Sequence, residues 1–373
     1  MVLAMSRKIY YLFLTSLLCC LTTAFAQESV CEDVSEKPAV YIPINIKTYE
    51  AEPQKFPVHI CSIYPWGIHG KQSKNHIYNF SFSLVVGEVR AMNGFQFSGL
   101  YSQSPESFNG LQIAGLGGNS AARLKGVQIG GVTNYSVKMR GIQIAGFANA
   151  AADNGMGVQI SGFVNGAANI KGVQIGGLGS AAQNVTGIQI GGISNLAQNI
   201  TGLQVASVYN RIDTLRGVSI GIASFADSIE KGISLSLVNI VRQGFYREWE
   251  LSFSDYANTA LSYRMGTPKF YTVYTTGVSS IEDEDNRWIT GVGFGNRTRI
   301  VKRFYFQPEL VSLIHLPTNL KSVQNVEARL KLGFGYYINE KFGLSLAPSV
   351  YAMSDNWEIK PGLSVGLGVR SEK

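Results

Sequence analysis

The side chains that most often carry catalysis or bind metal ions are few in this chain. It has four histidines and four cysteines among 373 residues, and the histidines are His59, His69, His76 and His315. His69 and His76 share a stretch rich in Gly and Lys that has no carboxylate, so a metal ion there would lack ligands. We expect His59 at the surface and His315 in an interfacial or loop position at the end of an apolar strand. No Ser/His/Asp or Cys/His arrangement is recognisable. The sequence therefore predicts no catalytic residue, no metal site and no cofactor.

Two further stretches resemble ligand sites only on first inspection. Gly291-Val-Gly293-Phe-Gly295 has the glycines of a phosphate loop, but no Lys-Ser/Thr and no helical pattern follows. Its glycines fall on the small-residue side of an alternating strand. The acidic run Ile281–Asp285 separates two strand patterns. It could bind a cation weakly, but a solvated external loop is the simpler interpretation.

The N-terminus has the pattern of an export signal. Arg7 and Lys8 precede the apolar stretch Ile9–Leu21, and Ala24-Phe25-Ala26 provides a small-x-small cleavage site. Cys19 follows two leucines and lacks the small preceding residue that a lipoprotein site needs, so lipid attachment there is the lesser alternative. We therefore predict a signal peptide at residues 1–26 and an exported mature chain.

The mature chain keeps two cysteines, Cys31 and Cys61, and an even number of cysteines in an exported protein indicates disulfide pairing. We predict a disulfide between them that ties a loop-rich segment at residues 27–76. This segment contains five of the eleven prolines. Two cysteines alone are too few for a structural metal site.

Charge and composition exclude some classes of function. The formal net charge is +7, charged residues make up only 15% of the chain, and the basic ones are scattered. Nucleic-acid binding needs a clustered basic face, so we predict none. No apolar run after the signal reaches the ~20 residues of a membrane helix. The 41 glycines disfavour helices, so the mature protein either is soluble or meets a membrane through β-structure.

A repeat of Gly-apolar-Gln-Ile dominates the middle of the chain, at intervals of 15 or 16 residues. A period of this kind is typical of a solenoid. Ser219 and Ser234 continue the series after the last glutamine. The glutamines of the repeat are Gln96, Gln112, Gln128, Gln143, Gln159, Gln174, Gln189 and Gln204.

The unit Gly187–Thr201 defines positions 1 to 15 of one coil. Positions 2 and 4 share one side of a strand, and Gln at position 3 points the other way. We place positions 2, 4, 7, 11 and 14 inside, with corners at Gly191-Gly192 and at Asn195. The glutamines then form an exposed, in-register ladder of amide hydrogen bonds. On this interpretation Ile190→Asp buries a charge. We predict a β-solenoid over residues 77–244.

The C-terminal part alternates large apolar residues with polar, charged or small ones. We predict eight antiparallel strands, near 247–255, 259–266, 269–278, 287–296, 302–314, 325–337, 342–351 and 361–370, that form a β-barrel at residues 245–373. A soluble sandwich or lipocalin-like barrel would alternate in the same way, and parity cannot say which side is inside.

Aromatic residues near the strand ends and the export signal favour an outer-membrane barrel. The final residues, Ser371-Glu372-Lys373, differ from the aromatic terminus of many such barrels. The aromatic residues in question are Trp249, Tyr263, Tyr271, Trp288, Tyr336, Tyr351 and Trp357.

Seven charged residues share the polar side of these strands. In an eight-stranded barrel the interior is just filled by side chains, so we expect a salt-bridged plug rather than a conducting channel. The predicted interior charges are Glu250, Arg264, Glu309, Glu327, Arg329, Lys331 and Arg370.

The repeat units Gly126–Asn134 and Gly187–Asn195 resemble the surface repeats of cell-envelope proteins from spirochaetes and Bacteroidota. The stretches Gly232–Asn239, Gly244–Phe253 and Arg264–Tyr271 are similar to uncharacterised Bacteroidota proteins. This resemblance covers about residue 77 to the C-terminus. It implies an exported envelope protein and supplies no catalytic residue.

The sequence therefore predicts a non-enzymatic protein of the outer membrane or cell surface. The barrel would sit in outer-membrane lipid, and the repeats would contact an envelope or extracellular protein or a glycan, or serve as a scaffold. One alternative is a single large barrel in which the repeats are membrane strands of a pore. The other is a secreted enzyme.

Overall fold

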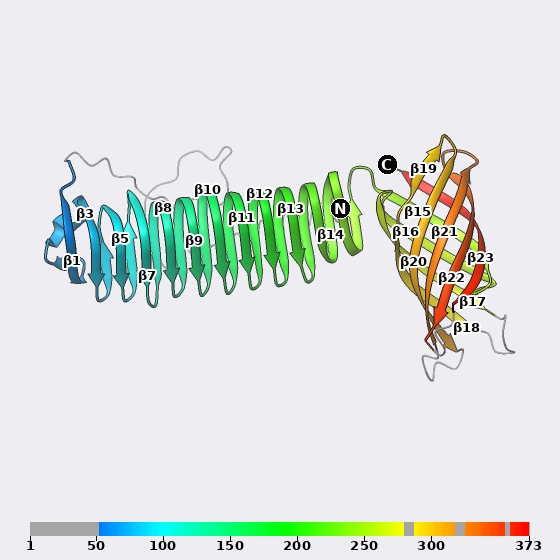
Figure 1. The fold of residues 1–373 in the computed structure, drawn as a ribbon, viewed down its shortest axis with the longest axis horizontal. Helices are drawn as coiled ribbons and strands as arrows, with labels where there is room; N and C mark the ends of the chain where they lie inside the picture. Colours follow the sequence, from blue (N-terminus) through cyan, green and yellow to red (C-terminus); the bar gives the residue numbers. More distant parts are fainter. Residues whose placement is uncertain (1–51, 280–286, 318–324, 355–358, 373) are drawn as a thin grey trace, which may run out of the picture. The chain divides into compact units, whose positions relative to one another are not determined.

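The computed structural model describes residues 52–279, 287–317, 325–354 and 359–372, and almost all of them lie in two β-sheets (Figure 1). The N-terminal sheet is a solenoid of about ten turns, and the C-terminal sheet is an eight-stranded antiparallel barrel. The predicted fold class is thus confirmed. No helix in these stretches is long and apolar enough to cross a membrane. The predicted signal peptide at 1–26 lies outside the described residues.

The solenoid is built from strands that pair in parallel, each with the next coil along the chain. In β12 and β13, for example, Gln189 pairs with Gln204, one 15-residue period later. The sheet begins before residue 77, because β1 already pairs in parallel with β3. Its elements are β1 (Lys55–Ile63), β2 (Trp66–Gly67), the 3-10 helix η1 (Gly70–Asn75), β3 (Ile77–Ser83), β4 (Val86–Glu88), β5 (Ala91–Ser98), β6 (Tyr101–Ser104), β7 (Ser107–Ala114), β8 (Gly118–Gly130), β9 (Thr133–Ala145), β10 (Ala148–Ser161), β11 (Val164–Gly176), β12 (Gly179–Gly191), β13 (Ser194–Ala206) and β14 (Tyr209–Val241).

The interior of the solenoid coil is polar on one side, and the predicted exposed glutamine ladder is wrong. Every glutamine of the series is fully buried, whereas Ile188 and Ile190 at positions 2 and 4 are each 36% exposed. Neighbouring amides donate to one another, with Nε2–Oε1 distances such as 2.8 Å from Gln204 to Gln189 and 3.2 Å from Gln189 to Gln174. Within the row, amides such as that of Gln189 bond to the coil before and the coil after, and only the end atoms Gln96 Nε2 and Gln204 Oε1 have no partner among the described residues. Burial of the row therefore costs little.

A second amide row completes this polar interior. Asn195 at position 9 is buried, and its Nδ2 donates to the Val205 carbonyl at 2.6 Å and to Asn210 Oδ1 at 3.3 Å. The asparagine therefore spans the inside of the coil and is not the predicted corner. Positions 11 and 14 are inside as predicted, with Ala197 and Ile200 buried. Position 7 is outside, since Ile193 is 49% exposed.

Glycine makes the coil corners. At position 1 the series Gly187, Gly202 and Gly217 has φ between 135° and 148°, which side chains rarely adopt. A Cβ on Gly202 would also lie 2.0 Å from the carbonyl oxygen of Gly187 in the preceding coil. The other corner is the bend at Gly192-Ile193, next to the predicted Gly191-Gly192 pair.

The barrel closes on itself through antiparallel pairs. β15 pairs with both β16 and β23, and β18 pairs with both β17 and β20. The solenoid and barrel strands belong to separate sheets, so the alternative of one large barrel is wrong. The barrel elements are β15 (Tyr246–Ser254), β16 (Thr259–Thr267), β17 (Phe270–Ser279), β18 (Arg287–Gly295), the short β19 (Thr298–Val301), β20 (Phe304–Pro317), β21 (Asn325–Tyr337), β22 (Phe342–Met353) and β23 (Lys360–Glu372).

Candidate functional site

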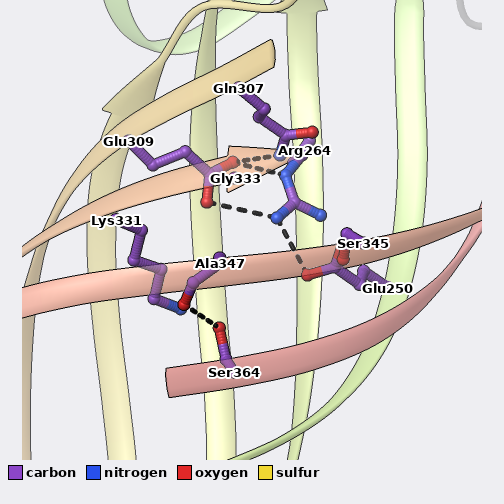
Figure 2. A pocket seen from close by; sticks show the side chains of 9 residues that line it. All are labelled: Glu250, Arg264, Gln307, Glu309, Lys331, Gly333, Ser345, Ala347 and Ser364. Atoms are coloured by element: carbon purple, nitrogen blue, oxygen red, sulfur yellow. Dashed lines mark hydrogen bonds and ion pairs between the residues drawn. The ribbon is translucent and has the colours of Figure 1, made fainter. Parts of the chain in front are cut away.

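The barrel interior is organised around Arg264 of β16 (Figure 2). Its Nε lies 2.6 Å from Glu309 on β20, and one terminal nitrogen lies 3.0 Å from Glu250 on β15. Its other terminal nitrogen lies 3.4 Å from Glu248. All four side chains are almost completely buried. One guanidinium on β16 therefore joins three carboxylates, two from β15 and one from β20.

Neutral groups satisfy the remaining oxygens of these carboxylates. Tyr271 donates to Glu309 at 2.8 Å, Gln307 donates to the same carboxylate at 2.6 Å, and Ser345 donates to Glu250 at 2.9 Å. A buried ion pair stabilises a fold only when its lone pairs are used in this way. The network therefore crosslinks strands around the barrel.

A second network is centred on Arg329 of β21, which is fully buried. It pairs with Glu327 on its own strand and with both oxygens of Asp255, each at 3.0 Å. Glu327 also contacts His315 on β20, with 3.1 Å between His315 Nε2 and the carboxylate. His315 is thus a buried barrel residue, not the predicted interfacial or loop residue.

The other two predicted interior charges bind tyrosines. Lys331 donates to the Tyr256 hydroxyl at 2.7 Å, and Arg370, which is half-buried, donates to the Tyr337 hydroxyl at 3.2 Å. All seven predicted charges thus lie with their polar atoms among these networks. The structure brings Glu250, Arg264 and Glu309 together and places Glu327 and Arg329 in a separate group.

Three charged partners were missed by the sequence analysis. Arg297 follows β18, stacks 4.1 Å from the Tyr305 ring and pairs with Glu248. Glu248 could have been found, because it shares the parity of Glu250. Arg297 and Asp255 stand outside the regular strands, where parity gives no signal. Together the five bases Arg264, Arg297, Arg329, Lys331 and Arg370 balance the five acids Glu248, Glu250, Asp255, Glu309 and Glu327.

Little space remains inside the barrel. The cavity beside Arg264 and Glu309 has a volume of about 10 Å³, close to the minimum that holds one water molecule. Next to the ionic networks, Tyr246, Tyr271, Val273, Ile289 and Leu313 belong to a buried apolar cluster. Charged, polar and aromatic side chains therefore fill the barrel interior around this small cavity.

The outside of the barrel is apolar. Along β21 the residues alternate strictly: Glu327, Arg329 and Lys331 are buried, while Val326, Ala328, Leu330, Leu332 and Phe334 are exposed. Trp249 and Trp288 are also more than half exposed. For Tyr271, one of the aromatic residues predicted near the membrane interface, the prediction is wrong because this residue is fully buried inside the barrel. Trp357 lies outside the described residues, as does the acidic run at 281–285.

The N-terminal end of the solenoid gathers three of the four histidines. The rings of His59 and His69 lie 5.8 Å apart, and those of His69 and His76 lie 6.1 Å apart. All three surround Tyr78, which is fully buried. The expectation that His59 is a surface residue is wrong, since it is 1% exposed. His59 is 17 residues from His76 in the sequence, and the parallel pairing of β1 with β3 brings the two residues close together.

Burial, helped by the neighbouring His69, lowers the pKa of His59 from 6.5 to about 4. Burial also raises the pKa of Tyr78 to about 12. Both ring nitrogens of His59 lack a hydrogen-bond partner within the described residues. Within those same residues, no group of His, Cys, Asp and Glu is arranged to hold a metal ion.

The predicted disulfide remains a prediction, because Cys31 lies outside the described residues. Its proposed partner Cys61 is buried on β1, with its Sγ 3.9 Å from the Val86 carbonyl oxygen. Burial raises the pKa of this thiol.

Comparison with solved structures gives similarities that cover about a third of this chain. No family model matches the sequence, and no curated protein matches it. Among solved structures, neisserial surface protein A is 11% identical, with 35% of this chain and 98% of that chain covered and a TM-score of 0.26. The outer membrane protein Ail of Yersinia pestis is 10% identical, covering 35% and 100%, with a TM-score of 0.25. A de novo designed transmembrane β-barrel is 9% identical, covering 35% and 97%, with a TM-score of 0.23. Likeness at this level assigns no function.

Proposed function

We propose that this protein is a non-enzymatic outer-membrane protein whose barrel is an anchor in lipid. The observation that carries the proposal is the direction of the barrel side chains. Ionised residues such as Arg264 and Glu309 are buried inside, and leucines, valines and phenylalanines cover the outside. A soluble barrel has the opposite arrangement. An apolar exterior around a closed ladder of backbone hydrogen bonds is what the bilayer interior requires.

An anchoring role follows from the filled interior. The carboxylates and guanidinium groups bind one another, and the cavity among them has room for about one water molecule. A substrate or a hydrated ion needs more space than this. If the barrel strands lie in lipid, the coils of the solenoid provide the surface that can contact other molecules. We therefore assign surface interaction or scaffolding to the coils, with an envelope or extracellular protein or a glycan as partner.

The anchor is tested by fractionation of cells that express the full chain. We expect the protein to remain with the outer membrane after washing with alkaline carbonate. Its gel mobility should also differ between boiled and unboiled samples, because a closed barrel resists detergent until heated. Release by carbonate, together with one mobility that heating does not change, would overturn the proposal.

Matched variants separate the outside of the barrel from its fold. Leu330→Arg with Leu332→Arg places two charges on the exterior of β21, where both leucines are about 40% exposed. Lys125→Glu with Lys171→Glu changes two charges on the solenoid exterior. We expect the first pair to reduce membrane insertion and the second pair to leave it unchanged.

A further inference from the structure

Rows of aliphatic side chains cover one exterior face of the solenoid. In the four coils that begin at Gly157, Gly172, Gly187 and Gly202, positions 2, 4 and 7 carry only Val, Ile, Leu and Phe, and the fifth coil has Val218 and Ile220 at positions 2 and 4. These side chains are exposed or half-buried, whereas position 3 between them is buried. Ile160, Ile175 and Ile190 at position 4 are 36–38% exposed, and Leu178 and Ile193 at position 7 are 40–49% exposed. We call these rows the aliphatic face.

The other exterior side of the same coils is polar. Across the position-1 glycine, position 15 carries the exposed residues Lys171, Thr186, Thr201 and Arg216. Asn184 and Asn199 form an exposed amide ladder beside them, at 2.8 Å. The coil is therefore amphipathic on its outside, and the aliphatic face is not an average surface.

The aliphatic face is large enough for a stable protein interface. At ~4.8 Å per coil and ~3.3 Å per residue, the five coils with position-2 residues from Val158 to Val218 present roughly 24 Å by 17 Å, or about 400 Å². The same positions recur on the neighbouring strands back to β5, which brings the total to roughly 700 Å². The largest apolar patch on a typical monomer covers ~300–600 Å², and a standard interface buries about 800 Å² on each partner.

We propose that the aliphatic face binds the aliphatic face of a second copy of this chain. Stacked Val and Ile on pleated strands are the composition of the layer between two packed sheets. The rows of two copies have the same spacing, because each coil is in register with the next, so ridges of one copy match grooves of the other along the whole face.

The residues of the face favour a protein partner over a lipid surface. Between Gly157 and Ile222, positions 2, 4 and 7 include no Trp or Tyr, which membrane-contacting surfaces place at the lipid–water boundary. The barrel of the same chain does expose Trp249 and Trp288. Pairing through the aliphatic face does not depend on the barrel lying in a membrane.

The test measures the mass of the full chain in lipid nanodiscs, each of which is loaded with one barrel. At micromolar protein concentration we expect two such discs to associate through their solenoids, so that each particle contains two copies of the chain. Ile175→Lys with Ile190→Lys should raise the dissociation constant at least ~10-fold, while the matched control Thr186→Lys with Thr201→Lys should leave it unchanged. Far-UV circular dichroism checks that all variants are folded. If the barrel does not enter nanodiscs, the same masses are measured in buffer, so failure of the anchor and failure of pairing are distinguishable.

A crosslinking experiment measures pairing independently, in case the lysine variant does not fold. In a background with Cys31 and Cys61 replaced by Ser, Ile175→Cys should couple two copies through a short bifunctional maleimide, and Thr186→Cys should not. A wild-type chain that is monomeric throughout, or equal crosslinking from both positions, would overturn the proposal. Quenching of a label at residue 175 by acyl-chain nitroxide lipids, without a doubled mass, would also overturn it and identify lipid as the occupant.

Discussion

The barrel and the solenoid both turn apolar side chains outward, but they satisfy their polar interiors by different means. In the barrel, Arg264 joins two carboxylates of the preceding strand β15 to Glu309, which lies 45 residues away on β20. In the solenoid, Gln189 bonds only to the same residue one coil before and one coil after. The barrel interior is ionic and depends on long-range closure, whereas the solenoid interior is neutral and repeats locally.

This difference shows what repetition makes possible. A neutral amide has donors and acceptors in one group, so a row of identical residues can satisfy itself. A charge cannot pair with a copy of itself, so an ionic interior needs different residues at defined places. The repeat therefore reuses one residue type, and the barrel needs a particular partner for every charge.

The largest effect should come from removing the central cation of the barrel. Arg264→Met leaves Glu248, Glu250 and Glu309 with fewer partners in a buried site, which should lower the free energy of unfolding by about 3–5 kcal/mol. Urea unfolding in detergent, followed by gel mobility, measures this. The double variant Arg264→Met with Glu309→Gln should recover part of the loss; if it does not, the pairing has less weight than we assign to it.

Replacement of one buried glutamine should lower the free energy of unfolding more than replacement of its exposed neighbour. Gln189→Leu leaves an acceptor on Gln174 and a donor on Gln204 unpaired, at a cost of about 3 kcal/mol for the two groups. Ile190→Asp faces outward, so we now expect a loss below about 1 kcal/mol. Thermal unfolding of the solenoid strands by circular dichroism compares the two. A larger loss for Ile190→Asp would reverse the inside and outside of the coil.

The stability effect of a charge placed on the barrel exterior shows whether that surface faces lipid or water. Leu330→Arg on β21 should destabilise the inserted barrel by about 2–4 kcal/mol if the residue lies near the middle of the bilayer. Thr186→Arg on the polar exterior of the solenoid should change its stability by less than about 0.5 kcal/mol. Unfolding in lipid vesicles gives both values, and equal small losses would speak against a lipid-facing barrel.

The smallest effect should be a pH dependence at the N-terminal end of the solenoid. The pKa of His59 is lowered to about 4 in the folded protein, below its unfolded value of 6.5. The folded state therefore binds fewer protons, and the free energy of unfolding falls as pH drops from about 6.5 towards 4, by about 1–3 kcal/mol. Hydrogen exchange of β1 and β3 amides at pH 7.5 and pH 5 measures it. His59→Phe should remove most of the dependence, and an unchanged dependence in that variant would assign it to other groups.

The sequence was a good guide wherever a pattern has a fixed period. The 15-residue repeat required stacked coils, and strict alternation located the eight barrel strands to within three residues. It failed at Gln189 and Asn195, because hydrophobicity alone places isoleucine inside. Only the neighbouring coil shows that an amide can be satisfied there. It also failed at His59 and Arg297, whose surroundings are made by segments distant in the chain.

By itself, the sequence determined the architecture: a coil length fixed by glycine corners, and strands whose two sides differ in character. The tertiary structure decided which side is inside. In the solenoid, the amide rows pair only when coils stack in register, and that pairing turns Ile188 and Ile190 outward. In the barrel, β15 pairs with the next strand and so brings Glu250 to Arg264, and closure adds Glu309 from β20. Parity is a local property, but satisfaction of a buried polar group depends on what the rest of the chain places beside it.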